Sequence, residues 1–141
     1  MKKVKEYEGM LQEVGPSMDE GGVVCYTYIR IGSELIKNIH IYKRLHEFFL
    51  AQVGNANCKL WVARHPFRLL IVAIRQHDGQ VYRIDLKGIY VCSAVLAITV
   101  GLLSYAGLYM LIFLLVCAAY PAWLIYSLVS QVRPIDADYE V

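Results

Sequence analysis

The distribution of charged and apolar positions divides the chain into two unequal parts. Residues 88–132 contain no Asp, Glu, Lys, Arg or His, and all of these residue types lie outside this stretch. Apolar surface left in water costs roughly 25 cal/mol per Å², so a run of this length is not expected on a soluble surface. The pattern predicts two membrane-spanning helices, at residues 89–105 and 108–131, because a bilayer needs about 20 apolar residues per helix.

Two features of the uncharged stretch bear on how these helices pack. Its turn is predicted at Ala106-Gly107, so the two helices form a hairpin. Small residues recur every four positions along the first helix, at Ser93, Ala97 and Gly101. Such stripes let helix backbones approach closely in lipid, and this one is expected to close the hairpin or to join two protomers. Neither predicted helix holds an ionisable residue, which argues against a transporter or pump.

The residues before the hairpin alternate as β-strands do. Apolar, β-branched and aromatic residues alternate along residues 23–31, which places Tyr26, Tyr28 and Arg30 together on one predicted face. A helical period around Leu45 predicts one or two turns of helix, and the composition of residues 15–22 is typical of a loop. Further strands are predicted at residues 5–14, 35–45, 58–63, 69–75 and 81–86.

The predicted element order is three strands, a short helix, and two or three strands. An OB-type, partly open barrel has this order, with its helix between the third and fourth strands. An SH3-like barrel, or a plain antiparallel sheet with one helix, fits the same order. We therefore expect an α+β membrane protein with three parts. These are a small antiparallel β-barrel or sheet domain (OB-like, one short helix) over residues 1–86, a transmembrane hairpin over 87–132, and an acidic tail over 133–141. We expect the tail to be disordered, and the alternatives are that it folds back on the basic domain or offers a peptide ligand.

Charge sets the expected orientation. The 141 residues carry a net charge of only +2, which is too small to indicate a polyanionic partner. The N-terminus has no apolar signal segment, so the β-rich domain is expected in the cytoplasm. Basic residues favour the cytoplasmic side, which predicts a bacterial inner-membrane protein with both termini cytoplasmic. Five basic residues near the first span are candidates for contact with lipid headgroups: Arg64, Arg68, Arg75, Arg83 and Lys87.

Reactive side chains form no recognisable catalytic or metal-binding pattern. The four cysteines form no C-x-x-C pair, and two of them lie in the predicted spans. That spacing argues against a disulfide framework and against a zinc site. The four histidines are spread over four predicted elements, without a hydrolase or phosphate-loop motif. The sequence therefore predicts no enzyme, no cofactor and no metal.

Aromatic and basic residues on the predicted strands form the candidate interaction face. A face of this kind can stack bases while arginines hold phosphates. Tethering to a membrane counts against a general role on nucleic acid, so we expect membrane lipids and a protein partner or a second copy instead. The residues of this candidate face are Tyr26, Tyr28, Arg30, Tyr42, Arg44 and Trp61.

Three functional hypotheses follow from this organisation. The first is a non-catalytic adaptor that recruits a protein to the membrane. The alternatives are a membrane-active toxin or secreted effector, or its immunity partner, and a sensor that binds a ligand or nucleotide. The combination is similar to small bacterial proteins that join an OB-like domain to a membrane anchor, such as the NfeD-like group. The order of the two parts is reversed here and no motif is shared, so no function is carried over.

Overall fold

The computed structural model describes residues 4–54, 58–65, 68–103 and 108–141. The chain forms two compact units. The first unit, the β-domain, consists of Met1–Ile84 together with Gln131–Val141. The second, the helical unit, is Asp85–Ser130. The C-terminal residues therefore belong to the same unit as the N-terminal strands.

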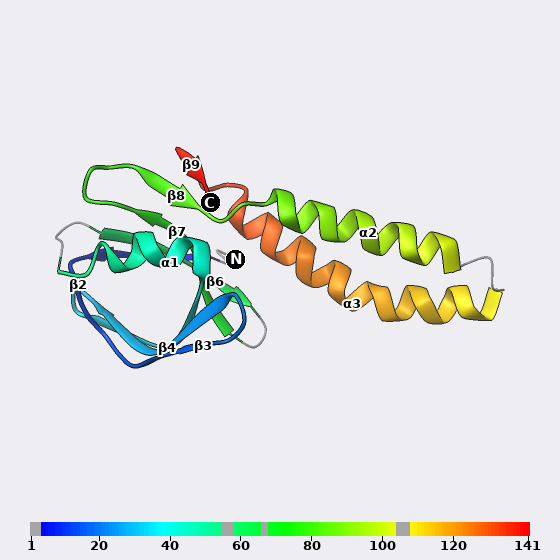
Figure 1. The fold of residues 1–141 in the computed structure, drawn as a ribbon, viewed down its shortest axis with the longest axis horizontal. Coiled ribbons are helices and arrows are strands. Elements are labelled where there is room, and N and C mark those ends of the chain that lie inside the picture. Colours follow the sequence, from blue (N-terminus) through cyan, green and yellow to red (C-terminus); the bar gives the residue numbers. More distant parts are fainter. Residues whose placement is uncertain (1–3, 55–57, 66–67, 104–107) are drawn as a thin grey trace. The chain divides into compact units, whose positions relative to one another are not determined.

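The described part of the β-domain contains one nine-stranded sheet and one helix, α1 (Lys43–Leu50) (Figure 1). α1 buries Leu45 and Phe49, which lie four residues apart and so share one helix face. The strands are β1 (Val4–Gly9), β2 (Leu11–Val14), β3 (Ser17–Asp19), β4 (Val23–Ile31), β5 (Glu34–Tyr42), β6 (Cys58–His65), β7 (Arg68–Arg75), β8 (Val81–Arg83) and β9 (Tyr139–Glu140).

The sheet is mixed, which corrects the expectation of an antiparallel one. Its main path has the order β1-β6-β7-β5-β4-β2, with β3 beside β4 and β8 beside β7. β5 runs parallel to β7, and β8 runs parallel to β9, while the other pairs are antiparallel. The first parallel pair arises because α1 and β6 intervene along the chain between β5 and β7.

The two ends of this path are consecutive in the chain. Only Met10 separates β1, which pairs with β6, from β2, which pairs with β4. The first segment therefore bridges both edges and closes the sheet on itself. A Cβ placed on Gly9 would lie 3.2 Å from the Cα of Gly32. The backbone at the end of β1 therefore approaches the turn after β4 closely, and a glycine stands at both positions. Gly9 has φ +148° and Gly32 has φ +54°, conformations that favour glycine.

Apolar side chains fill the space enclosed by the closed sheet. Several of them are completely buried, and they come from strands far apart in the sequence: Leu11, Ile29, Ile39, Ile41, Leu60, Ile71 and Ile74. Gln52, which follows α1, is also buried, and its Oε1 accepts a hydrogen bond from the backbone N–H of His77 at 3.2 Å. This pairing satisfies a polar group that would be costly to bury alone.

Two segments expected to lack regular structure form strands. Within the predicted loop at residues 15–22, β3 pairs with β4, Ser17 opposite Tyr26. Its three residues are all exposed, so no alternation marked it in the sequence. The acidic tail is also ordered, because Tyr139 and Glu140 form β9 beside β8. The expectation of a disordered tail is therefore wrong.

The helical unit contains most of two apolar helices, α2 (Lys87–Leu103) and α3 (Leu108–Val132). The predicted turn at Ala106-Gly107 lies outside the described residues. Among the described helices, one stretch is long and apolar enough to cross a membrane, Ile112–Val132, with a mean hydropathy of 2.1. α2 is a shorter apolar helix of 17 residues. The two-helix transmembrane hairpin therefore stays a prediction.

Candidate functional site

Tyr26 does not lie on the same face of β4 as Tyr28 and Arg30, with which it was predicted to share a surface. Tyr26 is only 3% exposed, its hydroxyl lies 2.6 Å from Nε2 of His46, and its ring centroid is 5.5 Å from that of Phe49. Burial lowers the pKa of His46 and raises the pKa of Tyr26, so both groups are neutral near pH 7. Tyr26 therefore joins β4 to α1 in the core, and the prediction that it shares an exposed face with Tyr28 and Arg30 is corrected.

A reversal of phase in β4 and β5 explains this difference. The pairing of β4 with β5 has the same register before and after Thr27 and Asn38, which lie at a gap in that pairing. Both residues are exposed, and Asn38 has φ +52°. On each strand, the buried residues are even-numbered before this point and odd-numbered after it. The buried positions are Val24 and Tyr26, then Ile29 and Ile31, on β4, and Ile36, then Ile39 and Ile41, on β5.

Beyond the reversal, two neighbouring cross-strand pairs form the β4–β5 outer face. Tyr28 lies opposite Lys37, and Arg30 lies opposite Leu35. Arg30, Leu35 and Lys37 are exposed, while Tyr28 is half-buried. The Tyr28 hydroxyl donates a hydrogen bond to Oε1 of Glu13 at 2.7 Å, so an acidic group belongs to the same surface. Leu35 and Lys37 were not predicted as part of this face. A two-residue turn at Gly32-Ser33 would pair Arg30 with Leu35 and Tyr28 with Lys37, so the turn was the available signal.

The other three candidate residues lie elsewhere on the β-domain. Tyr42 ends β5, opposite Val23 and five residues from Lys37. Arg44 is exposed in the first turn of α1. Trp61 lies on β6, which β7 separates from β5, and the Lys59 ammonium lies 5.1 Å from its ring centroid. The six predicted residues therefore do not form one surface.

The five candidate headgroup cations divide into two classes. Arg64, Arg68 and Lys87 are exposed. Arg75 instead forms an ion pair with Glu8 at 2.8 Å, and Arg83 forms one with Glu140. Two of the five cations therefore have carboxylate partners within the β-domain.

The tail is fastened to β8 by contacts that we term the C-terminal clasp. The backbone N–H of Asp138 donates to the carbonyl of Val81 at 3.0 Å, and that of Val141 donates to the carbonyl of Arg83 at 2.9 Å. The N–H of Val81 donates to Oδ2 of Asp138 at 2.8 Å. These bonds satisfy backbone groups on both segments.

Side chains complete the clasp. The ring of Tyr139 stacks on that of Tyr82 at 5.2 Å between centroids, and Tyr82 stacks on Phe48 of α1 at 4.3 Å. The Arg83 guanidinium binds the Glu140 carboxylate and donates to the carbonyl of Ile135 at 2.7 Å. Since β8 precedes the helical unit and β9 follows it, the chain leaves and re-enters the β-domain at neighbouring strands.

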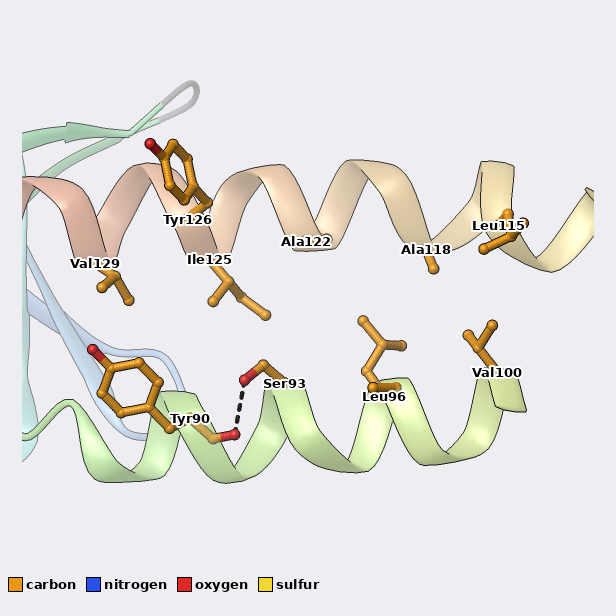
Figure 2. Close-up of a pocket in the computed structure, with 11 residues that line it drawn as sticks. Tyr90, Ser93, Leu96, Val100, Leu115, Ala118, Ala122, Ile125, Tyr126 and Val129 are labelled. Atoms are coloured by element: carbon orange, nitrogen blue, oxygen red, sulfur yellow. Dashed lines mark hydrogen bonds between the residues drawn. The ribbon is translucent and has the colours of Figure 1, made fainter. Parts of the chain in front are cut away.

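A groove of about 520 Å³ lies between α2 and α3 within the helical unit (Figure 2). Ser93 and Ala97 of the predicted small-residue stripe line it, and Gly101 is not among its lining residues. The stripe thus borders a groove, and its role in close helix packing stays a prediction. The remaining lining residues are Tyr90, Leu96 and Val100 on α2, and Leu115, Ala118, Ala122, Ile125, Tyr126 and Val129 on α3.

The arrangement offers surfaces for binding: an outer face with both signs of charge, a strand clasp and an apolar groove. Within the described ranges, no group of three or more His, Cys, Asp or Glu side chains is placed to hold a metal ion. Burial raises the pKa of the Cys58 thiol to about 11, which keeps it in the poorly nucleophilic thiol form. No protein-family profile, curated protein or solved structure matches the chain.

Proposed function

We propose that this chain is a two-pass bacterial inner-membrane protein whose cytoplasmic, OB-type β-domain recruits a protein partner to the membrane without catalysis. The observation that carries the recruiting role is the β4–β5 outer face. Tyr28, Arg30, Leu35 and Lys37 place an aromatic ring, an aliphatic side chain and two cations on neighbouring positions of two strands. Aromatic residues and Arg are enriched in protein–protein interfaces.

The sheet topology supports an OB-type barrel. Taking the bent β1–β2 segment as the first strand, β4, β5, β6 and β7 follow as the second to fifth, with α1 between the third and fourth. An OB-type barrel has this element order, and it binds its ligands on the face of its second and third strands. Those strands correspond to β4 and β5, the strands that carry the outer face described above.

The surface of the helical unit supports a place in the membrane. Large apolar side chains are more than 60% exposed on both helices, among them Val91, Ile98, Phe113 and Val116. A continuous apolar surface of this kind is unfavourable in water and is solvated by lipid. At 1.5 Å per residue, α3 is about 38 Å long and α2 about 26 Å, against a hydrocarbon core of about 30 Å. The predicted first span continues beyond α2 to residue 105.

The C-terminal clasp supports a hairpin over a single crossing. Because β8 and β9 pair side by side, the segment between them must begin and end on the same side of any bilayer that it enters. An even number of crossings satisfies this condition, whereas a single crossing would pull the two strands to opposite sides. Two apolar helices are the smallest such arrangement.

Charge on the outer face favours a protein partner over nucleic acid. Glu13 lies opposite Arg30 in the β2–β4 pairing and accepts the hydrogen bond of Tyr28. A carboxylate that borders this face would repel phosphates, on which nucleic-acid affinity mainly depends. A protein surface can match both signs of charge.

Purification of the full-length protein in mild detergent tests the proposal. The wild type should retain a stoichiometric partner, and an Arg30→Glu/Lys37→Glu variant should retain at least tenfold less, which corresponds to about 1.4 kcal/mol. An Arg64→Glu/Arg68→Glu variant makes the same change of charge on β6 and β7 and serves as the matched control. Equal recovery from all three proteins, or no partner with the wild type, would exclude recruitment through this face.

A further inference from the structure

The groove of the helical unit is an apolar channel between two walls. On α2 its lining residues recur at helical spacing, so one face of that helix borders it over about three turns. Figure 2 shows Leu96 and Val100 pointing across toward α3, and Ala118, Ile125 and Val129 pointing across toward α2. The opposed side chains leave a volume of about 520 Å³ between them.

Water is a poor occupant of this groove. A buried water needs two to four polar partners. The Ser93 hydroxyl already donates to the carbonyl of Tyr90 at 2.8 Å, and the lining from Leu96 to Leu115 is aliphatic. An empty groove would leave its walls without dispersion partners. Inside a bilayer, hydrocarbon is therefore the medium that fills it.

A helix of a second protomer is the other occupant that an apolar groove facing lipid could take, and it would be about 10–12 Å across with its side chains. An extended acyl chain carries no side chains and is much thinner than a helix. It can therefore lie between the side chains that project into the groove from both walls (Figure 2).

One end of the groove has the chemistry of a headgroup site. Tyr90 points its phenol ring toward α3 there, and Tyr126 lies on α3 at the same end with its ring turned away from α2 (Figure 2). Tyrosine is enriched where hydrocarbon meets water. Lys87 is exposed one turn before Tyr90, on the same side of α2. A cation in that position attracts an anionic headgroup.

We propose that the groove is a specific site for one acyl chain of an anionic phospholipid, with its headgroup at the Tyr90 end. This inference rests on the membrane location proposed above. The lipid completes the contact between α2 and α3, so the hairpin is a protein–lipid unit in its native state.

Native mass spectrometry of the full-length protein tests this site. The protein is extracted in detergent, mixed with dioleoyl phosphatidylglycerol and stripped stepwise by collisional activation. Ala97→Phe and Ala118→Phe fill the groove from opposite walls, while Ala94→Phe and Ala119→Phe add the same ring at exposed, non-lining neighbours. The wild type and the two neighbours should keep one lipid per chain, and each groove variant should lose at least tenfold of that bound fraction.

Each other outcome points to a different error. Equal retention by all five proteins means that the lipid binds only to the outer surface, and the site does not exist. Dimers that disappear in the groove variants identify a second copy as the occupant and overturn the lipid. Release of the wild type from membranes by alkaline carbonate would contradict the proposed membrane location itself. A wild-type protein that stays in the membrane in carbonate but retains no lipid would contradict only the proposed lipid site.

Discussion

Arg83 connects separate segments of the β-domain through one planar group. Its side chain is 15% exposed, and it binds Glu140 while donating to the carbonyl of Ile135. Arginine can serve two acceptors at once because its donors form a rigid fork, whereas the lysine ammonium is a point charge. Arg83 is therefore a structural residue of the tail, although the sequence grouped it with the headgroup cations.

Replacing Arg83 should loosen the tail. Arg83→Ala is expected to lower the free energy of unfolding by about 2 kcal/mol, because hydrogen bonds to charged groups each contribute about 1.5–3 kcal/mol. Limited proteolysis should also cleave the tail faster. Lys5→Ala is the control, since its pair with Glu34 leaves the two side chains 62% and 52% exposed, and it should change stability by less than about 1 kcal/mol. Equal effects of the two variants would contradict the role of Arg83.

His46 should make the β-domain less stable in acid. Burial lowers its pKa from 6.5, and this effect exceeds the opposing influence of Glu47 and Asp19. The unfolded chain therefore binds the proton more readily. The stabilisation is complete above pH 6.5 and is lost as pH falls through the lowered folded-state pKa. Burial shifts His65 in the same direction, with a smaller contribution from Arg68.

Thermal unfolding of the full-length protein at pH 8 and pH 5 measures this effect. The unfolding midpoint temperature of the wild type should be lower at pH 5 than at pH 8. In His46→Gln the difference between the two temperatures should be smaller. Glutamine can still pair with the Tyr26 hydroxyl but does not titrate in this range. A variant with the same pH dependence as the wild type would show that His46 is not the group responsible.

At the scale of elements, closure of the sheet depends on the close approach of β1 to the turn after β4. Gly9→Ala would place a Cβ 3.2 Å from the backbone of Gly32, at φ +148°. We expect a loss of about 1–3 kcal/mol, as for other strained backbone positions. Urea unfolding, followed by Trp61 fluorescence in a Trp123→Phe background, measures it. Gly88→Ala meets no atom within 4 Å and should cause no loss, so equal destabilisation by both would refute the contact.

The sequence predicted most elements, because alternation is a local signal. The patterns around β4, β7 and α1 marked those elements within a few residues of their bounds. Alternation failed at Thr27 and Asn38, where both strands reverse phase together. The reversal depends on the backbone of two paired strands, so neither strand shows it alone. Because of this reversal, Tyr26 lies in the core, and Leu35 and Lys37 lie on the outer face beside Tyr28 and Arg30.

The clasp was missed for a different reason. β9 has two residues, too few to show a period, and acidic residues surround it. Its position depends on Arg83 and Tyr82, which lie more than fifty residues earlier in the chain. Pairing between residues so far apart leaves no local pattern in the sequence. The charge complementarity of tail and β8 was the available signal.

At the scale of the whole molecule, the hairpin prediction has a direct test in cells. With both termini cytoplasmic, Gly107→Cys should react with a membrane-impermeant maleimide in intact spheroplasts. Ser33→Cys, in the exposed turn of the β-domain, should react only after lysis. The buried, high-pKa thiol of Cys58 should stay unlabelled in the folded protein. A Gly107→Cys protein labelled only after lysis would invert or abolish the proposed topology.

The order of β8, the two helices and β9 along the chain also sets an order of biogenesis. The edge strand β8 is synthesised before the helices, and its partner is synthesised after them. We expect β8 to stay uncovered during translation, and the clasp to close only after the translocon has received both helices. In pulse-chase experiments, β8 should gain protease protection only after β9 has been synthesised, and chains lacking residues 138–141 should be degraded faster. Closure of the clasp would then mark completed insertion, because a chain stalled in the translocon exposes Tyr82 and Arg83 to quality-control proteases.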